Sequence, residues 1–167
     1  MTTPGANPFA AHASAWITAF WRWEPERWAC VGWTFAGSRA SILDMAPDPF
    51  LCVIYTTKSS PMDVPNRGRV MGVYELSHEI GHRDAFTRGD SHAYFPERWQ
   101  HAARALRAWE CPDRPPTDWL EPRIYEQRGM ARTAGIHGVR MSAAGVERAR
   151  SLHWREVGMF RPDTGDG

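Results

Sequence analysis

The chain has 167 residues, of which 43% are hydrophobic and 23% are charged, and its formal net charge is +1. These values are typical of one globular domain with a core of its own, and they exclude a histone-like protein that binds nucleic acid through charge alone. No segment approaches the roughly 18 apolar residues that cross a membrane. The opening stretch, MTTPGANPFAAHASAW, lacks the basic and apolar regions of a secretory signal. We therefore expect a cytoplasmic protein without a membrane partner.

Cysteine and tryptophan usage adds two further expectations. The three cysteines have no CxxC spacing, which predicts buried reduced thiols: Cys30, Cys52 and Cys111. The chain has nine tryptophans, and four of them fall within thirteen residues: Trp21, Trp23, Trp28 and Trp33. A pocket that grips one or two nucleotides is compatible with this composition.

The first half of the chain predicts mainly strands. Residues 1–13 are rich in Ala, Pro and Gly and are expected to be loose, and residues 14–167 are expected to form a single domain. Aromatic density favours a strand over a short helix in SAWITAFWRW, and WACVGWTF is a second strand candidate. Ser38 to Met45 begins with a serine cap and predicts a short helix. The strongest strand runs from Phe50 to Thr57 because it is rich in β-branched and aromatic residues.

The middle of the chain alternates strands and loops. KSSPMDVPNRG has the composition of a loop, and Arg69 to Leu76 is a strand candidate. A polar stretch from Ser77 to about Pro96 is long enough to be a functional loop. ERWQHAARAL is compatible with a helix, whereas the overlapping ALRAWEC fits a strand that ends at Pro112.

The last third of the chain predicts an irregular segment, a helix and a strand. Four prolines make Pro112 to Arg123 irregular. SAAGVERARSLH has a serine cap and predicts a helix, and WREVGMF predicts a closing strand. Strands outnumber helices and are not separated by regular long helices. We therefore expect an α+β fold with a curved or barrel-like mixed β-sheet and a few flanking helices.

One short motif suggests zinc chemistry. His78, Glu79 and His82 match HExxH, in which two histidines on one face of a helix bind Zn²⁺ and the glutamate acts as general base. Gly68, Gly72 and Gly81 disfavour a helix there by about 1 kcal/mol each relative to Ala. The preceding residues prefer a strand, and no third ligand lies in a recognisable second motif. We therefore expect no metal or other cofactor, and keep a zinc-dependent hydrolase as the alternative.

A different set of features indicates base recognition. A first strand ends in Trp33-Thr34 and is followed by AGSR and a short helix. A second strand opens into a polar loop at FLCVIYTTKSSP. The segment GRVMGVYE then has the form G-x-V-x-G-h-x-E, where h is apolar. Over about residues 30 to 112 this arrangement resembles the PUA-like superfamily, especially its EVE and YTH branches. The resemblance implies a PUA-like domain over residues 14–167 that binds a methylated cytosine or adenine flipped into an aromatic pocket.

The resemblance also implies a site. Trp33 would form one wall of the pocket, and Thr34 would bond the edge of the base. A second aromatic wall would come from the long loop, in which Phe86, Tyr94, Phe95 and Trp99 are candidates. Five residues would lie at the rim, near sugar or phosphate: Ser38, Arg39, Lys58, Ser59 and Ser60. The position of Ser38 and Arg39, where the YTH pattern has an Asn, leaves the recognised base open.

The expected function is therefore non-catalytic binding of a modified base in DNA or RNA, alone or with proteins of a defence or modification system. The zinc hydrolase that uses His78, Glu79 and His82 is the first alternative. A protein-interaction module with exposed tryptophans is the second.

Overall fold

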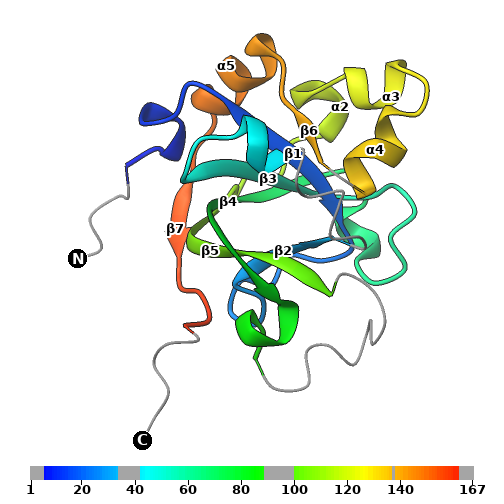
Figure 1. Ribbon diagram of the computed structural model, residues 1–167. Coiled ribbons are helices and arrows are strands. Elements are labelled where there is room, and N and C mark those ends of the chain that lie inside the picture. The colour runs from blue at the N-terminus through cyan, green and yellow to red at the C-terminus, as the bar shows by residue number, and fades with distance from the viewer. Residues whose placement is uncertain (1–5, 34–41, 89–99, 137, 162–167) are drawn as a thin grey trace, which may run out of the picture.

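The protein is built on a strongly curled β-sheet flanked by short helices (Figure 1). The structure is a computed structural model that describes residues 6–33, 42–88, 100–136 and 138–161. Within these ranges the sheet has seven strands: β1 (Ala15–Phe20), β2 (Cys30–Trp33), β3 (Phe50–Thr56), β4 (Val70–His82), β5 (His101–Glu110), β6 (Val139–Arg140) and β7 (Arg155–Val157). The α-helices with described bounds are α2 (Thr117–Leu120), α3 (Arg123–Glu126), α4 (Met130–Ile136) and α5 (Ala143–Ser151), and the 3₁₀ turns are η1 (Pro8–Ala10), η2 (Val64–Asn66) and η3 (Arg83–Phe86). Residues 42–45, the described end of the helix predicted from Ser38 to Met45, are also helical.

The strands follow the order β2-β5-β4-β3-β1-β6 across the sheet. β1 and β3 are parallel, and the other pairs are antiparallel. One edge of β5 pairs with β4, while the other edge pairs with β2 at residues 101 to 104 and with β7 at residues 108 to 110. The expected α+β class, with a curved mixed sheet and a few flanking helices, is therefore confirmed.

The sheet separates two apolar cores, and β3 contributes to both. All seven residues of β3 are buried, and successive side chains point to opposite faces. Leu51 and Val53 enter the core beneath the helices, which also contains Ile124 and Val146. Even-numbered residues of β3, such as Cys52, enter the core on the concave side. A strand buried on both faces is a continuous apolar run, which explains why β3 was the clearest strand in the sequence.

Two segments differ from their predicted structure. β4 does not end at Leu76, because Ser77 to His82 continue it and pair with β5 after an irregularity in register between Leu76 and Ile80. The prediction of a loop from Ser77 is therefore wrong for these six residues. His101 to Leu106 are also strand rather than helix, because β5 is hydrogen-bonded between β4 and β2. In both cases sheet pairing between distant segments outweighs local propensity.

The described part of the N-terminal segment packs against the domain instead of lying loose. Phe9 is fully buried, and its ring lies 5.3 Å from that of Trp154, centroid to centroid. Asn7 donates from Nδ2 to the carbonyl of Arg150 at 2.8 Å. The proline-rich segment after Pro112 likewise contains α2, whose Leu120 is fully buried. The predicted helix after Ser142 is confirmed as α5, with the Ser142 side chain as its cap.

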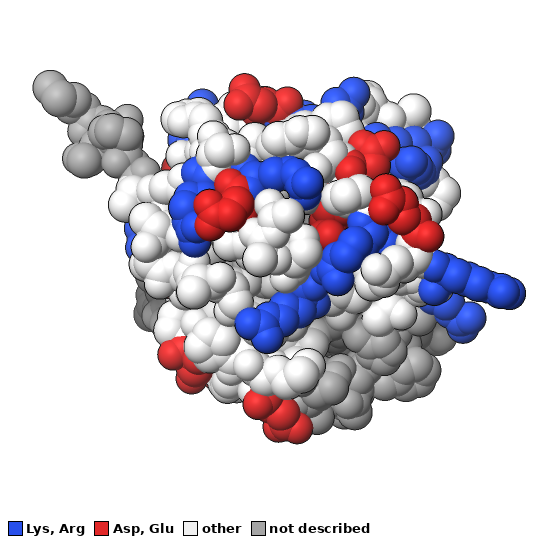
Figure 2. Space-filling view, turned by 90° about the horizontal axis from the view of Figure 1, so that it is seen from above, with Lys and Arg blue, Asp and Glu red and all other residues white. Residues whose placement is uncertain are grey.

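The surface of the helix-covered side carries charges of both signs. Figure 2 shows arginine or lysine side chains interspersed with aspartate or glutamate on this face, without one continuous basic area. The formal net charge of +1 agrees with this mixture. No helix within the described ranges is long and apolar enough to cross a membrane.

Candidate functional site

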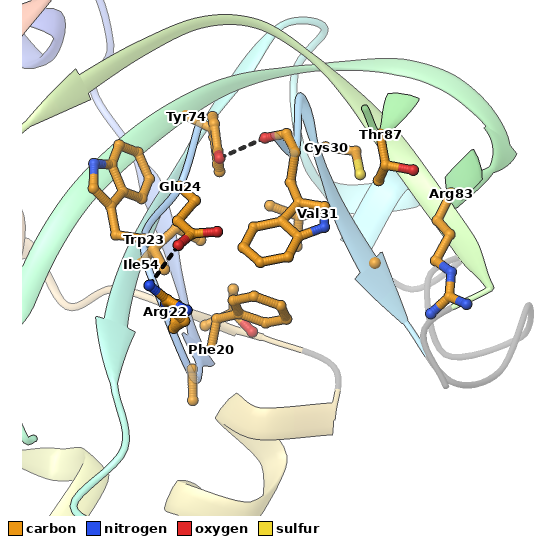
Figure 3. A pocket seen from close by; sticks show the side chains of 14 residues that line it. Phe20, Arg22, Trp23, Glu24, Cys30, Val31, Ile54, Tyr74, Arg83 and Thr87 are labelled. Carbon is orange, nitrogen blue, oxygen red and sulfur yellow. Dashed lines mark hydrogen bonds and ion pairs between the residues drawn. The ribbon is translucent and has the colours of Figure 1, made fainter. Parts of the chain in front are cut away.

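A pocket opens on the concave side of the curled sheet (Figure 3). The cavity itself has a volume of about 60 Å³, which is small beside the roughly 300–1,000 Å³ of sites that enclose a drug-sized ligand. The lining comes from β1, the loop that follows it, β2, β3, β4 and η3: Thr18, Ala19, Phe20, Arg22, Trp23, Glu24, Trp28, Cys30, Val31, Gly32, Ile54, Tyr74, Arg83 and Thr87.

The loop between β1 and β2 forms one wall of this pocket and is fixed at several points. Ser60 donates its hydroxyl to the carbonyl of Trp21 at 2.8 Å, and Tyr74 donates its hydroxyl to the carbonyl of Trp28 at 2.7 Å. The backbone N–H of Phe160 donates to the carbonyl of Pro25 at 3.0 Å. Contacts from the loop after β3, from β4 and from the C-terminal segment therefore hold the loop in place before any ligand arrives.

Four aromatic side chains line the pocket: Phe20, Trp23, Trp28 and Tyr74. Trp23 packs against Tyr74 with ring centroids 4.8 Å apart, and Phe20 meets Trp28 edge to face at 5.6 Å. The Trp23 ring lies directly over Gly72, where an added Cβ would be 2.4 Å from a ring carbon. A glycine in β4 thus leaves the space that this tryptophan occupies.

The polar groups of the pocket centre on Glu24. Its Oε1 accepts from the guanidinium of Arg22 at 2.7 Å, and its Oε2 lies 3.6 Å from Nε of Arg27. This Oε2 is buried and accepts no hydrogen bond from any residue that the structure describes. The buried hydroxyl of Thr87 is likewise without a hydrogen-bond partner in the described ranges. Two buried polar atoms without partners are therefore available beside the aromatic rings.

Two weakly acidic groups of the pocket are held neutral. Burial raises the pKa of the Cys30 thiol to about 12, although the charge of Arg83 opposes the shift. Burial, together with the nearby Cys30, Glu26 and Glu24, raises the pKa of Tyr74 well above its ordinary value. Cys30 is therefore a poor nucleophile, and the phenol of Tyr74 remains a hydrogen-bond donor.

The structure places the residues predicted for the site in several locations. Trp33 ends β2 next to Gly32, a lining residue, but the side chain of Trp33 is not among the described parts. Six other predicted or candidate residues lie outside the described ranges: Thr34, Ser38, Arg39, Tyr94, Phe95 and Trp99. Phe86 is buried beside Gly81 and does not line the pocket.

Three predicted rim residues follow β3. Lys58 places its Nζ 4.0 Å from the ring centre of Tyr125, on the helix-covered side of the sheet. Ser59 is exposed, and neither residue lines the pocket. Ser60 is fully buried, and its bond to the carbonyl of Trp21 supports the pocket wall without lining it.

The HExxH residues lie on a strand. Four residues of extended chain separate the Cα atoms of His78 and His82 by about 13 Å, whereas one turn of helix would bring them together. His78 Nε2 lies 3.0 Å from the carbonyl of Pro47, while His82 Nδ1 faces Asp84 at 3.4 Å. No group of three metal-binding side chains occurs among the described residues. The geometry that HExxH chemistry requires is thus not formed here.

Three central residues of the pocket were not predicted from the sequence: Trp23, Glu24 and Trp28. The four tryptophans between residues 21 and 33 are the signal for them in the sequence, but the strand-end pattern singles out Trp33 and does not distinguish Trp23 or Trp28. Comparisons with protein families, curated proteins and solved structures found no match for the chain. The pocket, which is lined by aromatic side chains and a few buried polar atoms, is therefore the basis for the proposed function.

Proposed function

We propose that this protein is a PUA-like domain of the EVE or YTH type that binds a modified nucleobase of DNA or RNA without catalysis. The base, flipped out of its strand, would occupy the pocket on the concave side of the sheet. The observation that carries this proposal is the grouping of Phe20, Trp23, Trp28 and Tyr74 around one open cavity.

The physical basis is stacking. An unstacked base offers a flat face, and stacking on an aromatic side chain contributes roughly 1–3 kcal/mol per base. Ala19, Val31 and Ile54 supply apolar surface in the same pocket, against which a methyl group on the base is removed from water. A methylated base is therefore expected to bind better than its unmodified counterpart.

The anchoring of the pocket wall supports binding as the role of this site. Because Ser60, Tyr74 and Phe160 already fix the loop from Trp21 to Trp28, little conformational freedom remains to be lost when a ligand enters. The neutral Cys30 thiol offers weak nucleophilic chemistry. A pre-formed aromatic pocket without an activated nucleophile among its described residues fits a reader better than an enzyme.

The proposal is tested by titrating matched oligonucleotides with the protein. Single-stranded and duplex DNA and RNA, each with one 5-methylcytosine or N6-methyladenine and each with the unmodified base, are compared by fluorescence anisotropy. We expect the methylated form to bind more tightly, and Trp28→Ala to weaken its binding by about tenfold or more, the size of one lost stacking contact.

The matched control is Trp119→Ala, because Trp119 lies on α2 and is 44% exposed, outside the pocket. This variant should bind as the unmodified protein does. Equal loss in both variants, or no preference for any methylated oligonucleotide, would refute the proposal. Trp33→Ala, tested alongside, shows whether the side chain implied by the family resemblance also contacts the base.

A further inference from the structure

We infer that Glu24 determines which base the pocket accepts, by selecting a base that carries an amino group on its pairing edge. This inference rests on the proposed function and concerns the same pocket. It follows from the hydrogen bonding of the Glu24 carboxylate, because only one of its two oxygens has a partner among the described residues.

The two oxygens of this carboxylate are in different situations. Oε1 is occupied by the guanidinium of Arg22 at 2.7 Å, whereas the buried Oε2 accepts no hydrogen bond within the described ranges. Only 11% of the side chain is exposed. Figure 3 shows the Glu24 carboxylate directed toward the middle of the lining side chains, with Arg22 reaching it from one side. Arg22 therefore orients the carboxylate and leaves one oxygen for a ligand.

Neighbouring charged side chains in the described ranges do not supply a hydrogen bond to Oε2 of Glu24. Nε of Arg27 is 3.6 Å from Oε2, too far for a hydrogen bond. Glu26, on the same turn, is exposed and does not line the pocket. A buried acceptor without a donor is costly, so a ligand that supplies an N–H gains more here than it would from a group already satisfied.

The chemistry of a carboxylate then defines the ligand. An ionised carboxylate accepts hydrogen bonds and cannot donate them. Cytosine and adenine present an amino group on their pairing edge, while thymine and uracil present a carbonyl oxygen at the position of the cytosine amino group. An amino group satisfies Oε2 of Glu24, whereas a carbonyl oxygen facing it would be repelled. The pocket should therefore accept amino-bearing bases and reject their carbonyl counterparts.

5-Methylcytosine and thymine form a matched pair for testing this, because both carry the methyl group and differ on the pairing edge. Two single-stranded oligonucleotides that differ only at this base are titrated with the protein, and the ratio of their dissociation constants is measured. We expect 5-methylcytosine to bind about tenfold more tightly or better, as for one hydrogen bond to a charged group.

Glu24→Gln should bring this ratio close to one, because its amide donates to a carbonyl as readily as it accepts from an amino group. Glu26→Gln is the matched control: it removes the same charge from the same turn, outside the pocket, and should keep the ratio. Thermal unfolding of both variants verifies that they fold. If Glu24→Gln does not fold, the wild-type ratio still tests the inference, because equal binding of the two oligonucleotides would overturn it.

The outcomes separate this inference from the proposed function. Equal binding of both oligonucleotides by the wild-type protein, or a ratio that Glu24→Gln leaves unchanged, would overturn the role of Glu24 and leave base binding intact. Failure to bind either these oligonucleotides or the methylated adenine probe would overturn both. A ratio that collapses in Glu24→Gln and persists in Glu26→Gln would establish the assignment.

Discussion

Single residues decide the shape of this pocket, and Gly72 is the clearest example. Its position in β4 lies beneath the Trp23 ring and faces the backbone carbonyl of Trp109. A Cβ there would be 2.4 Å from the ring and 2.6 Å from the carbonyl oxygen. The ring could turn away, but the strand that carries the carbonyl is held in the sheet. The size of residue 72 therefore controls both the position of Trp23 and the packing of β4 on β5.

We predict that Gly72→Ala destabilises the protein by about 2–3 kcal/mol, the upper part of the range for overpacking, and also weakens binding of the methylated oligonucleotide. Denaturant unfolding and anisotropy measure the two effects. Gly135→Ala is the control, because nothing lies within 4 Å of the added Cβ in α4. That variant should be neutral or more stable by up to about 1 kcal/mol. Unchanged stability of Gly72→Ala would contradict the packing described here.

Glu121 is a buried carboxylate whose role is structural. It is fully buried, accepts from Nε of Arg123 at 2.8 Å, and accepts from the backbone N–H of Ser142 at 2.7 Å. Burial alone would raise its pKa, but the hydrogen bonds from Arg123 and Ser142 outweigh burial and lower the pKa below its ordinary value of 4.5. Glu121 thus links the end of α2 to the cap of α5.

The lowered pKa fixes the sign of a pH effect. The unfolded chain takes up a proton at Glu121 before the folded protein does, so the stabilisation is present above pH 4.5 and is lost as the pH falls through the folded-state pKa. We predict that Glu121→Gln lowers the free energy of unfolding at pH 7 by about 2 kcal/mol, and that its difference from wild type shrinks in acid. Glu147→Gln, at an exposed site of α5, should have little effect at any pH.

At the scale of elements, the sequence predicted strands wherever local preference and burial agree. β3 is apolar throughout because both of its faces are covered, and α5 follows a serine cap that the sequence displays. The second half of β4 and the start of β5 were not predicted, because polar or helix-favouring residues there are held as strands by pairing with each other and with β2. Such pairing between distant segments leaves no local signal.

The strand conformation of β4 also predicts the behaviour of the HExxH residues with zinc. Because His78 and His82 are separated by about 13 Å of extended chain, they do not share one ion. We expect the zinc content after dialysis, measured by atomic emission, to be the same for the wild-type protein and His78→Ala. Stoichiometric zinc that disappears in His78→Ala would show that the chain binds metal through this motif and would favour the hydrolase alternative.

At the scale of the whole molecule, the candidate site depends on contacts that no sequence pattern shows. The aromatic pocket combines β1, β2, β3, β4 and η3. The sequence displayed a cluster of tryptophans but not which of them share a cavity. Trp23 and Trp28 line the pocket because Ser60 and Tyr74 fix the loop that carries them. The curved sheet was predictable from composition and strand order, whereas the cavity is a product of its curling.

Strand β3 connects the two cores, so we expect them to unfold together. Leu51 and Val53 lie in the core under the helices, while Cys52 and Ile54, in the same strand, lie in the core on the concave side. Loss of either core therefore removes support from β3 and from the other core. Phe9 extends the helix-side core to the N-terminal segment, where it is fully buried against Trp154.

We therefore predict that Phe9→Ala destabilises the entire domain by about 3–5 kcal/mol, the range for removing a buried phenylalanine side chain. Unfolding should remain a single transition when followed by tryptophan fluorescence and by far-ultraviolet circular dichroism, because both cores share β3. Val64→Ala, at a position that is 58% exposed in η2, should change stability by less than about 0.5 kcal/mol. Separate transitions for the two probes in Phe9→Ala would mean that the helix-side core unfolds while the pocket side stays folded. Oligonucleotide binding would then survive this mutation, whereas global unfolding is expected to weaken that binding.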